Sequence, residues 1–135
     1  MFRRKAIPQR LHPAYDAFTA QAERVQAARK ALLSCLPVGR VEPAPVSVGL
    51  DVLRDEVTAV AEAMEDWRVG EVDEQWRRCR VAIDEALEAV PRARKLAEAT
   101  AELEELLGAV SDVVEPLGNA WRAAEQRWRA LRERV

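Results

Sequence analysis

The sequence has very little of the side-chain chemistry on which metal sites depend. His12 is the only histidine in 135 residues, which excludes a zinc site with two histidine ligands and the paired Glu-x-x-His ligands of a four-helix di-iron protein. Pro13 follows it, and proline is well tolerated at the start of a helix, so we interpret His12 as a cap or an exposed residue rather than a catalytic base. We expect no metal and no cofactor.

Cysteine is almost as scarce. Cys35 and Cys79 are the only two, and they lack the close pairing typical of metal-binding cysteines. We predict that both are buried free thiols rather than a disulfide, which is typical of proteins in a reducing compartment. The sequence therefore predicts a cytoplasmic protein.

Several motifs that would identify an enzyme or a membrane protein are missing. The chain contains neither a phosphate-binding glycine loop nor a Gly-x-Ser-x-Gly sequence. No apolar run approaches the roughly 20 residues needed to span a bilayer, and no apolar segment follows the basic start to make a secretory signal. We predict that the protein is not an enzyme and has no transmembrane segment.

Alternating apolar and polar residues, the pattern of strands, are missing too, whereas helix-forming residues dominate the composition. The clearest pattern is an apolar stripe with steps of three and four residues, close to the heptad period of packed helices. It consists of Leu103, Leu107, Val110, Val114, Leu117, Trp121, Ala124, Trp128, Leu131 and Val135. The sequence thus predicts an all-α fold with coiled-coil-like heptad seams.

Apolar periodicity and helix breakers divide the chain into an antiparallel four-helix bundle made of two helical hairpins. Pro91 should kink the third helix, Pro116 should bend the fourth, and Gly108 should separate them, although one long helix over 92–135 stays open. The predicted segments are a basic flexible arm at 1–12, helices at 13–36, 50–68, 72–107 and 110–135, and a proline-rich loop at 37–49 that joins the hairpins.

The last helix is the predicted interface. Its stripe is complete and the other seams are rich in alanine, so a partner, most simply a second copy of the chain, is expected to pack along it. The interface candidates are Leu117, Trp121, Trp128, Leu131 and Val135. We predict a non-enzymatic interaction or scaffold protein that self-associates as a dimer or binds another helical protein. Trp128→Ala should then weaken self-association more than helicity.

Charge suggests two further surfaces. The carboxylates Glu98, Glu102, Glu105 and Asp112 are predicted to form an acidic stripe that docks a basic partner helix; they would splay along a helix rather than converge on a metal. The arm residues Arg3, Arg4, Lys5 and Arg10, with the Arg- and Trp-rich last helix, suggest an alternative function as a peripheral binder of nucleic acid or an anionic surface. The strongly acidic middle of the chain opposes nucleic-acid binding, and membrane-surface contact is the weaker interpretation of the last helix.

Overall fold

Four long helices make up most of the described part of the chain. The structure is a computed structural model that describes residues 7–36, 43–99 and 102–133. Within these ranges the regular elements are all helical, which confirms the predicted all-α class. The elements are the 3-10 helix η1 (Gln9–Leu11), α1 (His12–Ser34), α2 (Pro43–Ala63), the 3-10 helices η2 (Met64–Trp67) and η3 (Gly70–Val72), α3 (Asp73–Glu98) and α4 (Leu103–Glu133).

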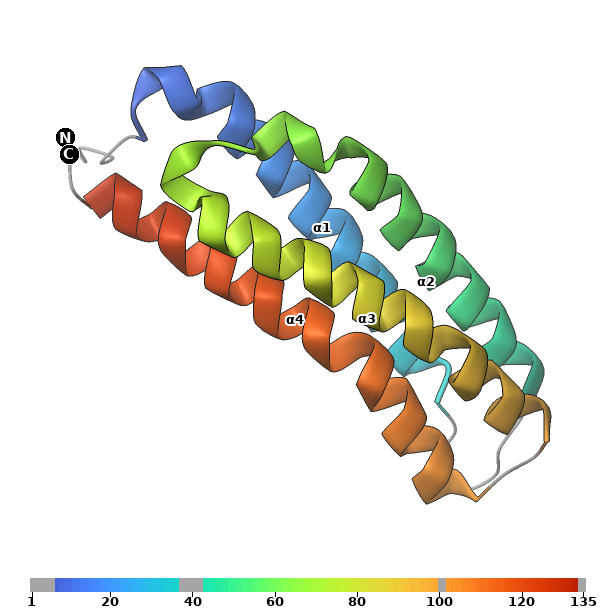
Figure 1. Cartoon of the computed structure of the whole chain (residues 1–135). Helices are drawn as coiled ribbons and strands as arrows, with labels where there is room; N and C mark the ends of the chain where they lie inside the picture. The colour runs from blue at the N-terminus through green and yellow to red at the C-terminus, as the bar shows by residue number, and fades with distance from the viewer. Residues whose placement is uncertain (1–6, 37–42, 100–101, 134–135) are drawn as a thin grey trace, which may run out of the picture.

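The helices pack side by side into an elongated body, and the start of α1 lies at the same end as the finish of α4 (Figure 1). The contact between α3 and α4 is the most extensive, and α2 contacts both α1 and α3. Contact between α1 and α4 is the least extensive of the four helix pairs. The backbones of α1 and α4 are therefore farther apart than those of the other three pairs, and large side chains fill the seam between them.

α2 begins within the segment 37–49, which was expected to be a loop. Residues 37–42 lie outside the described ranges, but the helix starts at Pro43 and includes Pro45 and Gly49. Prolines are tolerated there because the first four N–H groups of a helix have no acceptor within the helix. Gly49 is buried close to Leu32 of α1, so its missing side chain lets the two helices approach.

The third and fourth helices divide earlier than Gly108. α3 ends at Glu98 and α4 begins at Leu103, so Gly108 lies inside α4. An interior glycine costs a helix only about 1 kcal/mol relative to alanine, less than the burial of the apolar face of α4 provides. Pro91 and Pro116 lie inside α3 and α4.

The buried stripe of α4 differs from the predicted seam at its start. Leu106 and Val113 are fully buried, whereas Leu107 is 39 % exposed. A straight helix drifts by about 20° per heptad relative to a strict seven-residue repeat. A strict seven-residue stripe counted from the tryptophans toward the start of α4 therefore turns away from the core. Leu106 and Val113 are buried there, whereas Leu107 is not.

The predicted flexible arm is ordered from Ile7 onward. Residues 1–6 lie outside the described ranges, but Ile7 and Leu11 are buried in the core. The His12 ring nitrogen Nε2 lies 2.8 Å from the Ile7 carbonyl oxygen, and Arg10 forms an ion pair with Glu71. Two apolar side chains four residues apart provide enough burial to hold this segment against the bundle.

The two glycines inside α4 should respond differently to alanine. A Cβ atom on Gly108 would meet open space, whereas one on Gly118 would lie 2.5 Å from the Arg29 guanidinium. Gly108→Ala is expected to raise the free energy of unfolding by about 1 kcal/mol through helix propensity. Gly118→Ala should gain less or lose stability, because Arg29 must move from its hydrogen bond with the Val114 carbonyl. Urea denaturation of the two variants, and of Gly118→Ala in an Arg29→Ala background, measures this. An equal gain at both glycines would contradict the expected contact.

Candidate protein-binding groove between α1 and α4

The residues predicted to form an interface lie in the core of the single chain. Leu117, Trp121, Trp128 and Leu131 are 0 %, 5 %, 1 % and 8 % exposed; Val135 lies outside the described residues. The ring centroid of Trp128 is 5.5 Å from that of Tyr15 on α1. In the closed bundle a second copy could reach these four side chains only if the seam that covers them opened.

The predicted acidic stripe is divided between two helices. Glu98 is at the end of α3, whereas Glu105 and Asp112 are on α4 and Glu102 immediately precedes it. Glu98 accepts a hydrogen bond from Arg94 at 3.2 Å, and Asp112 lies 4.0 Å from Arg92. The four carboxylates therefore do not share one helix face, and two of them already have arginine partners.

One residue of the predicted basic arm can be placed. Arg3, Arg4 and Lys5 lie outside the described residues, and Arg10 pairs with Glu71. The pKa of the Glu71 carboxyl is held below its ordinary value, mainly by the hydrogen bond from Arg10. The backbone amide of Glu71 and the charges of Arg10 and Arg127 lower it further. Arg10, the one described residue of the four basic candidates, is thus paired with a carboxylate of the same chain.

The ion pair predicts a pH effect. Because the pKa of Glu71 is lowered in the folded state, its contribution to stability is present above the ordinary pKa and is lost as the pH falls through the lowered value. Arg10→Ala is expected to raise the pKa of Glu71 toward 4.5, measured by NMR titration of the carboxyl carbon. Arg77→Ala, which removes an exposed partner of Asp73, should leave it unchanged. An unchanged Glu71 pKa in Arg10→Ala would contradict the pairing.

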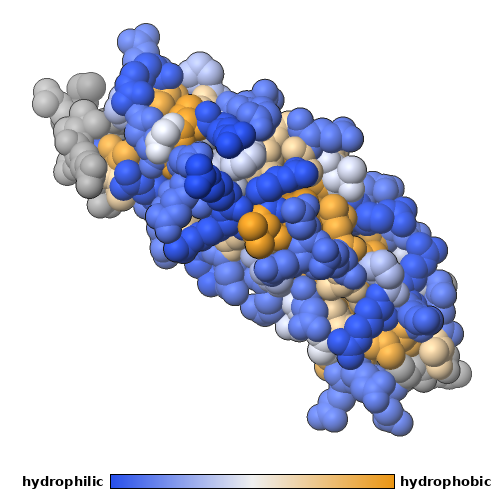
Figure 2. Space-filling view, viewed as in Figure 1, coloured by the Kyte–Doolittle hydropathy of each residue, from blue (hydrophilic) through white to orange (hydrophobic). Residues whose placement is uncertain are grey.

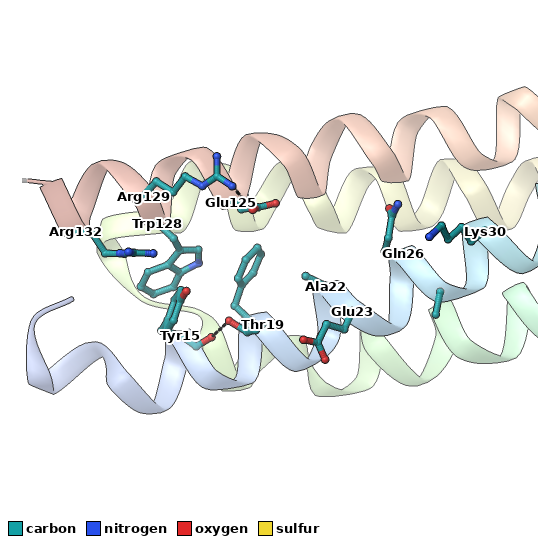
Figure 3. Close-up of a pocket in the computed structure, with 12 residues that line it drawn as sticks. Tyr15, Thr19, Ala22, Glu23, Gln26, Lys30, Glu125, Trp128, Arg129 and Arg132 are labelled. Atoms are coloured by element: carbon teal, nitrogen blue, oxygen red, sulfur yellow. Dashed lines mark hydrogen bonds and ion pairs between the residues drawn. The ribbon is translucent and has the colours of Figure 1, made fainter. Parts of the chain in front are cut away.

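The α1–α4 seam contains the cavity that we take as the candidate site. It has a volume of about 570 Å³, within the range of ligand pockets. Figure 3 shows Tyr15 of α1 and Trp128 of α4 next to each other at one end of it, near Arg132, with Lys30 at the other end. Its lining comprises Tyr15, Phe18, Thr19, Ala22, Glu23, Gln26, Ala27, Lys30, Glu125, Trp128, Arg129 and Arg132.

A second cavity of about 360 Å³ continues the first along the same seam. The two cavities share Ala22, Gln26 and Glu125. The second is also lined by Val25, Arg29, Leu117, Gly118, Trp121 and Arg122. Together these residues define the α1–α4 groove, an elongated depression with an aromatic floor and charged rims.

Two indole N–H groups along this groove are buried without an acceptor. Trp121 Nε1 and Trp128 Nε1 have no hydrogen-bond partner. By contrast, Trp67 Nε1 donates to Gln21 Oε1 at 2.8 Å and Trp76 Nε1 donates to the Met64 carbonyl at 2.8 Å. An unpaired buried donor costs about 1–3 kcal/mol of stability. Among the described residues, the buried side-chain donors that lack an acceptor are therefore concentrated at this seam.

One hydrogen bond closes the far end of the groove. Arg29 Nε of α1 donates to the Val114 carbonyl of α4 at 2.9 Å, and its guanidinium crosses α4 where Gly118 has no side chain. Arg29 also donates to Gln26 Oε1 at 2.8 Å. α1 is thus fastened to α4 at the Gly118 end, and among the described residues no second hydrogen bond joins the two helices near Arg132.

In the described part of the chain, the side chains that commonly ligate metals are dispersed. Within it, no group of three or more His, Cys, Asp or Glu side chains is placed to hold a metal ion. Burial raises the pKa of the Cys79 thiol, and Cys35 Sγ lies 3.2 Å from the Ala31 carbonyl oxygen. Among the described helices none is long and apolar enough to cross a membrane.

Further cavities of about 530 and 630 Å³ lie along α3 and α4 and are lined mainly by polar side chains. Figure 2 shows the face seen in Figure 1 as mostly hydrophilic, with apolar colour in small separate patches. The large exposed apolar side chains are distributed over all four helices, as Leu33, Val48, Val52, Val81 and Leu107. Scattered exposed residues of this kind are normal on a protein surface.

Sequence reasoning missed three residues that shape the seam. Gln21 is a buried polar residue on α1 that bonds to Trp67 and to the Ala63 carbonyl, and nothing in the periodicity distinguishes it from a solvated glutamine. Arg29 and Gly118 act as a pair across two helices far apart in sequence. The glycine inside a long apolar stripe was the only available signal of a close approach.

Comparison with known proteins adds no family to this description, because no protein-family model, curated protein or solved structure matches the chain.

Proposed function

We propose that this chain is an antiparallel four-helix bundle that works as a non-enzymatic protein-interaction protein, with the α1–α4 groove as the site that receives a helix of its partner. The observation that carries the proposal is the pair of buried, unpartnered indole N–H groups of Trp121 and Trp128 along the helix seam with the least contact. Both tryptophans were interface candidates from the sequence, and the proposal moves the interface from the outside of α4 into this seam.

The unpaired donors lower the cost of opening this seam relative to a seam whose buried donors are all paired. Each unpaired donor costs the closed bundle about 1–3 kcal/mol, and a partner that supplies acceptors removes that penalty. Buried tryptophan and tyrosine side chains dominate the binding energy of many interfaces. A groove between two helices is the usual receptor for an amphipathic helix, and the small side chain of Ala22 leaves room for close packing.

Position-specific photo-crosslinking tests the proposal. A photoreactive amino acid at Gln26, which lines both cavities, is expected to give a defined protein adduct in cell extract, and one at Val52, which is exposed on α2, is not. Ala22→Phe, which fills the groove, should abolish the Gln26 adduct because it occupies the space of the partner helix. The matched control Ala59→Phe places the same bulk at a half-buried alanine of α2.

The adduct itself identifies the partner class. An adduct of twice the mass of the chain would assign the groove to a second copy, as the sequence analysis expected. Adducts of equal yield from Gln26 and Val52, or a Gln26 adduct that survives Ala22→Phe, would contradict docking in the groove. A circular dichroism spectrum and a melting curve for each variant establish that it is folded.

A further inference from the structure

The geometry points to an acidic amphipathic helix as the partner of the α1–α4 groove. This inference rests on the proposed function and goes one step further, because it names the chemistry of the occupant. Three features of the groove carry it: the excess of cations along its rims, the buried and unpaired indole donors of the two tryptophans that line it, and the spacing between those donors.

Positive charge is concentrated at the groove although the whole chain has a net charge of −2. Its rims carry two carboxylates, Glu23 and Glu125. The cations lining the two cavities are Arg29, Lys30, Arg122, Arg129 and Arg132. The groove is therefore a basic strip on an acidic protein.

Only one of these five cations is neutralised by a carboxylate within the described residues. Arg129 bonds to Glu125 at 2.8 Å, whereas Arg29 donates to neutral oxygen atoms. Lys30, Arg122 and Arg132 form no ion pair or hydrogen bond with any residue that the structure describes. Three uncompensated cations beside a partly closed, apolar floor favour a partner that brings negative charge.

The two unpaired indole N–H groups also favour an acidic partner. An indole N–H can only donate, so Trp121 and Trp128 both need acceptors from the partner. They are seven residues apart on α4, which is about 10 Å along a helix axis. Glutamate or aspartate side chains two turns apart on a partner helix would match this spacing, while its apolar residues cover Tyr15 and Phe18. Hydrogen bonds from an N–H to a charged acceptor are stronger than neutral ones.

Nucleic acid could pair with the cations of the rims, but it matches the apolar aromatic residues of the groove poorly. Phe18, Trp121 and Trp128 are buried, so any partner reaches them only when α1 moves away from α4. An oligonucleotide would then bring its charged phosphates beside this apolar surface, whereas an amphipathic helix covers it with apolar side chains. A helix with one apolar and one acidic face suits both the floor and the rims.

Binding of designed peptides to the full chain tests the inference. The probe is a labelled amphipathic peptide of about 18 residues, five helical turns, with a leucine stripe flanked by glutamates. A second peptide carries lysine at every glutamate position, and a single-stranded oligonucleotide serves as the nucleic-acid arm. Fluorescence anisotropy at low and high salt gives the affinity of each. We expect the acidic peptide to bind at least about tenfold more tightly than the basic one, with the difference reduced by salt.

Variants locate the binding. Arg132→Glu, and separately Arg132→Ala, should weaken binding of the acidic peptide, and Ala22→Phe should abolish it. Lys95→Glu makes the same charge change as Arg132→Glu at an exposed residue of α3 that does not line the groove. It should have little effect on binding. Melting temperatures establish that each variant is folded, and Arg132→Ala separates loss of charge from introduced repulsion.

The outcomes separate this inference from the proposed function. Equal affinity for the acidic and basic peptides, with both lost in Ala22→Phe, would overturn the acidic partner while leaving the groove as the docking site. Acidic-peptide binding that Ala22→Phe does not change would overturn docking in the groove as well. Failure of the acidic peptide to bind overturns the inference, as does an oligonucleotide that binds more tightly than the peptide and depends on Arg132.

Discussion

Replacing Trp67 with alanine is expected to lower the free energy of unfolding by about 3–5 kcal/mol. Its side chain is fully buried between the helices, where η2 follows α2. Its ring centroid lies 5.0 Å from that of Phe18 in an edge-to-face arrangement and 6.4 Å from that of Trp121. The substitution removes a large apolar volume at a point that joins α1, η2 and α4.

The polar end of Trp67 adds to this loss. Its Nε1 donates to Gln21 Oε1 at 2.8 Å, and Gln21 Nε2 donates to the Ala63 carbonyl at 2.9 Å, where α2 ends. Without the indole, Gln21 keeps one bond but its buried oxygen atom loses its donor, which costs about 1–3 kcal/mol. The tryptophan therefore both fills the core and completes a buried hydrogen-bond chain.

Urea denaturation followed by circular dichroism measures the effect, with the slope of the transition showing whether unfolding stays two-state. Gln21→Leu serves as the comparison, because it removes the polar chain while it keeps Trp67 and most of the apolar volume. We expect it to cost less than Trp67→Ala. If Trp67→Ala cost less than about 1 kcal/mol, in the range of ordinary surface substitutions, Trp67 would not be the centre of the core.

The helical class could be predicted because periodicity records burial directly. Apolar residues such as Leu53, Val57 and Val60 recur at helical spacing and are all fully buried. Helix boundaries were less predictable, because Pro43 and Gly108 were expected to lie outside the helices on the basis of intrinsic helix propensity alone. At Pro43 and Gly108 the local cost is small compared with the burial gained by a longer helix, and only the packed structure sets that balance.

The candidate site could be predicted only in part, for a related reason. The spacing of Trp121 and Trp128 correctly placed them on one face of a helix, but the same stripe suits a partner chain and the chain's own α1. Neither the contact between Tyr15 and Trp128 nor the missing acceptors of the two indoles is encoded locally. Both depend on how closely α1 approaches α4, which is a property of the whole bundle.

Replacing Trp128 with alanine should now act mainly on the fold. The side chain is 1 % exposed and its ring lies 6.1 Å from that of Phe18. We expect a loss of about 3 kcal/mol in the free energy of unfolding, at the low end of the range for Trp→Ala, because the substitution also removes an unpaired donor. Light scattering at two salt concentrations shows whether self-association changes as well. A loss of self-association with unchanged stability would return Trp128 to the surface role that the sequence suggested.

Phenylalanine at the same position separates packing from hydrogen bonding. Trp128→Phe loses apolar area but also removes a buried N–H that has no acceptor, so the two effects oppose each other and the net change should stay below about 1 kcal/mol. Trp67→Phe loses similar area and breaks a formed hydrogen bond, so it should cost about 2 kcal/mol more. Equal costs at the two positions would mean that Trp128 has an acceptor in solution. The seam between α1 and α4 would then keep only Trp121 Nε1 as an unsatisfied donor, and the proposed spacing of two acceptors on the partner helix would fail.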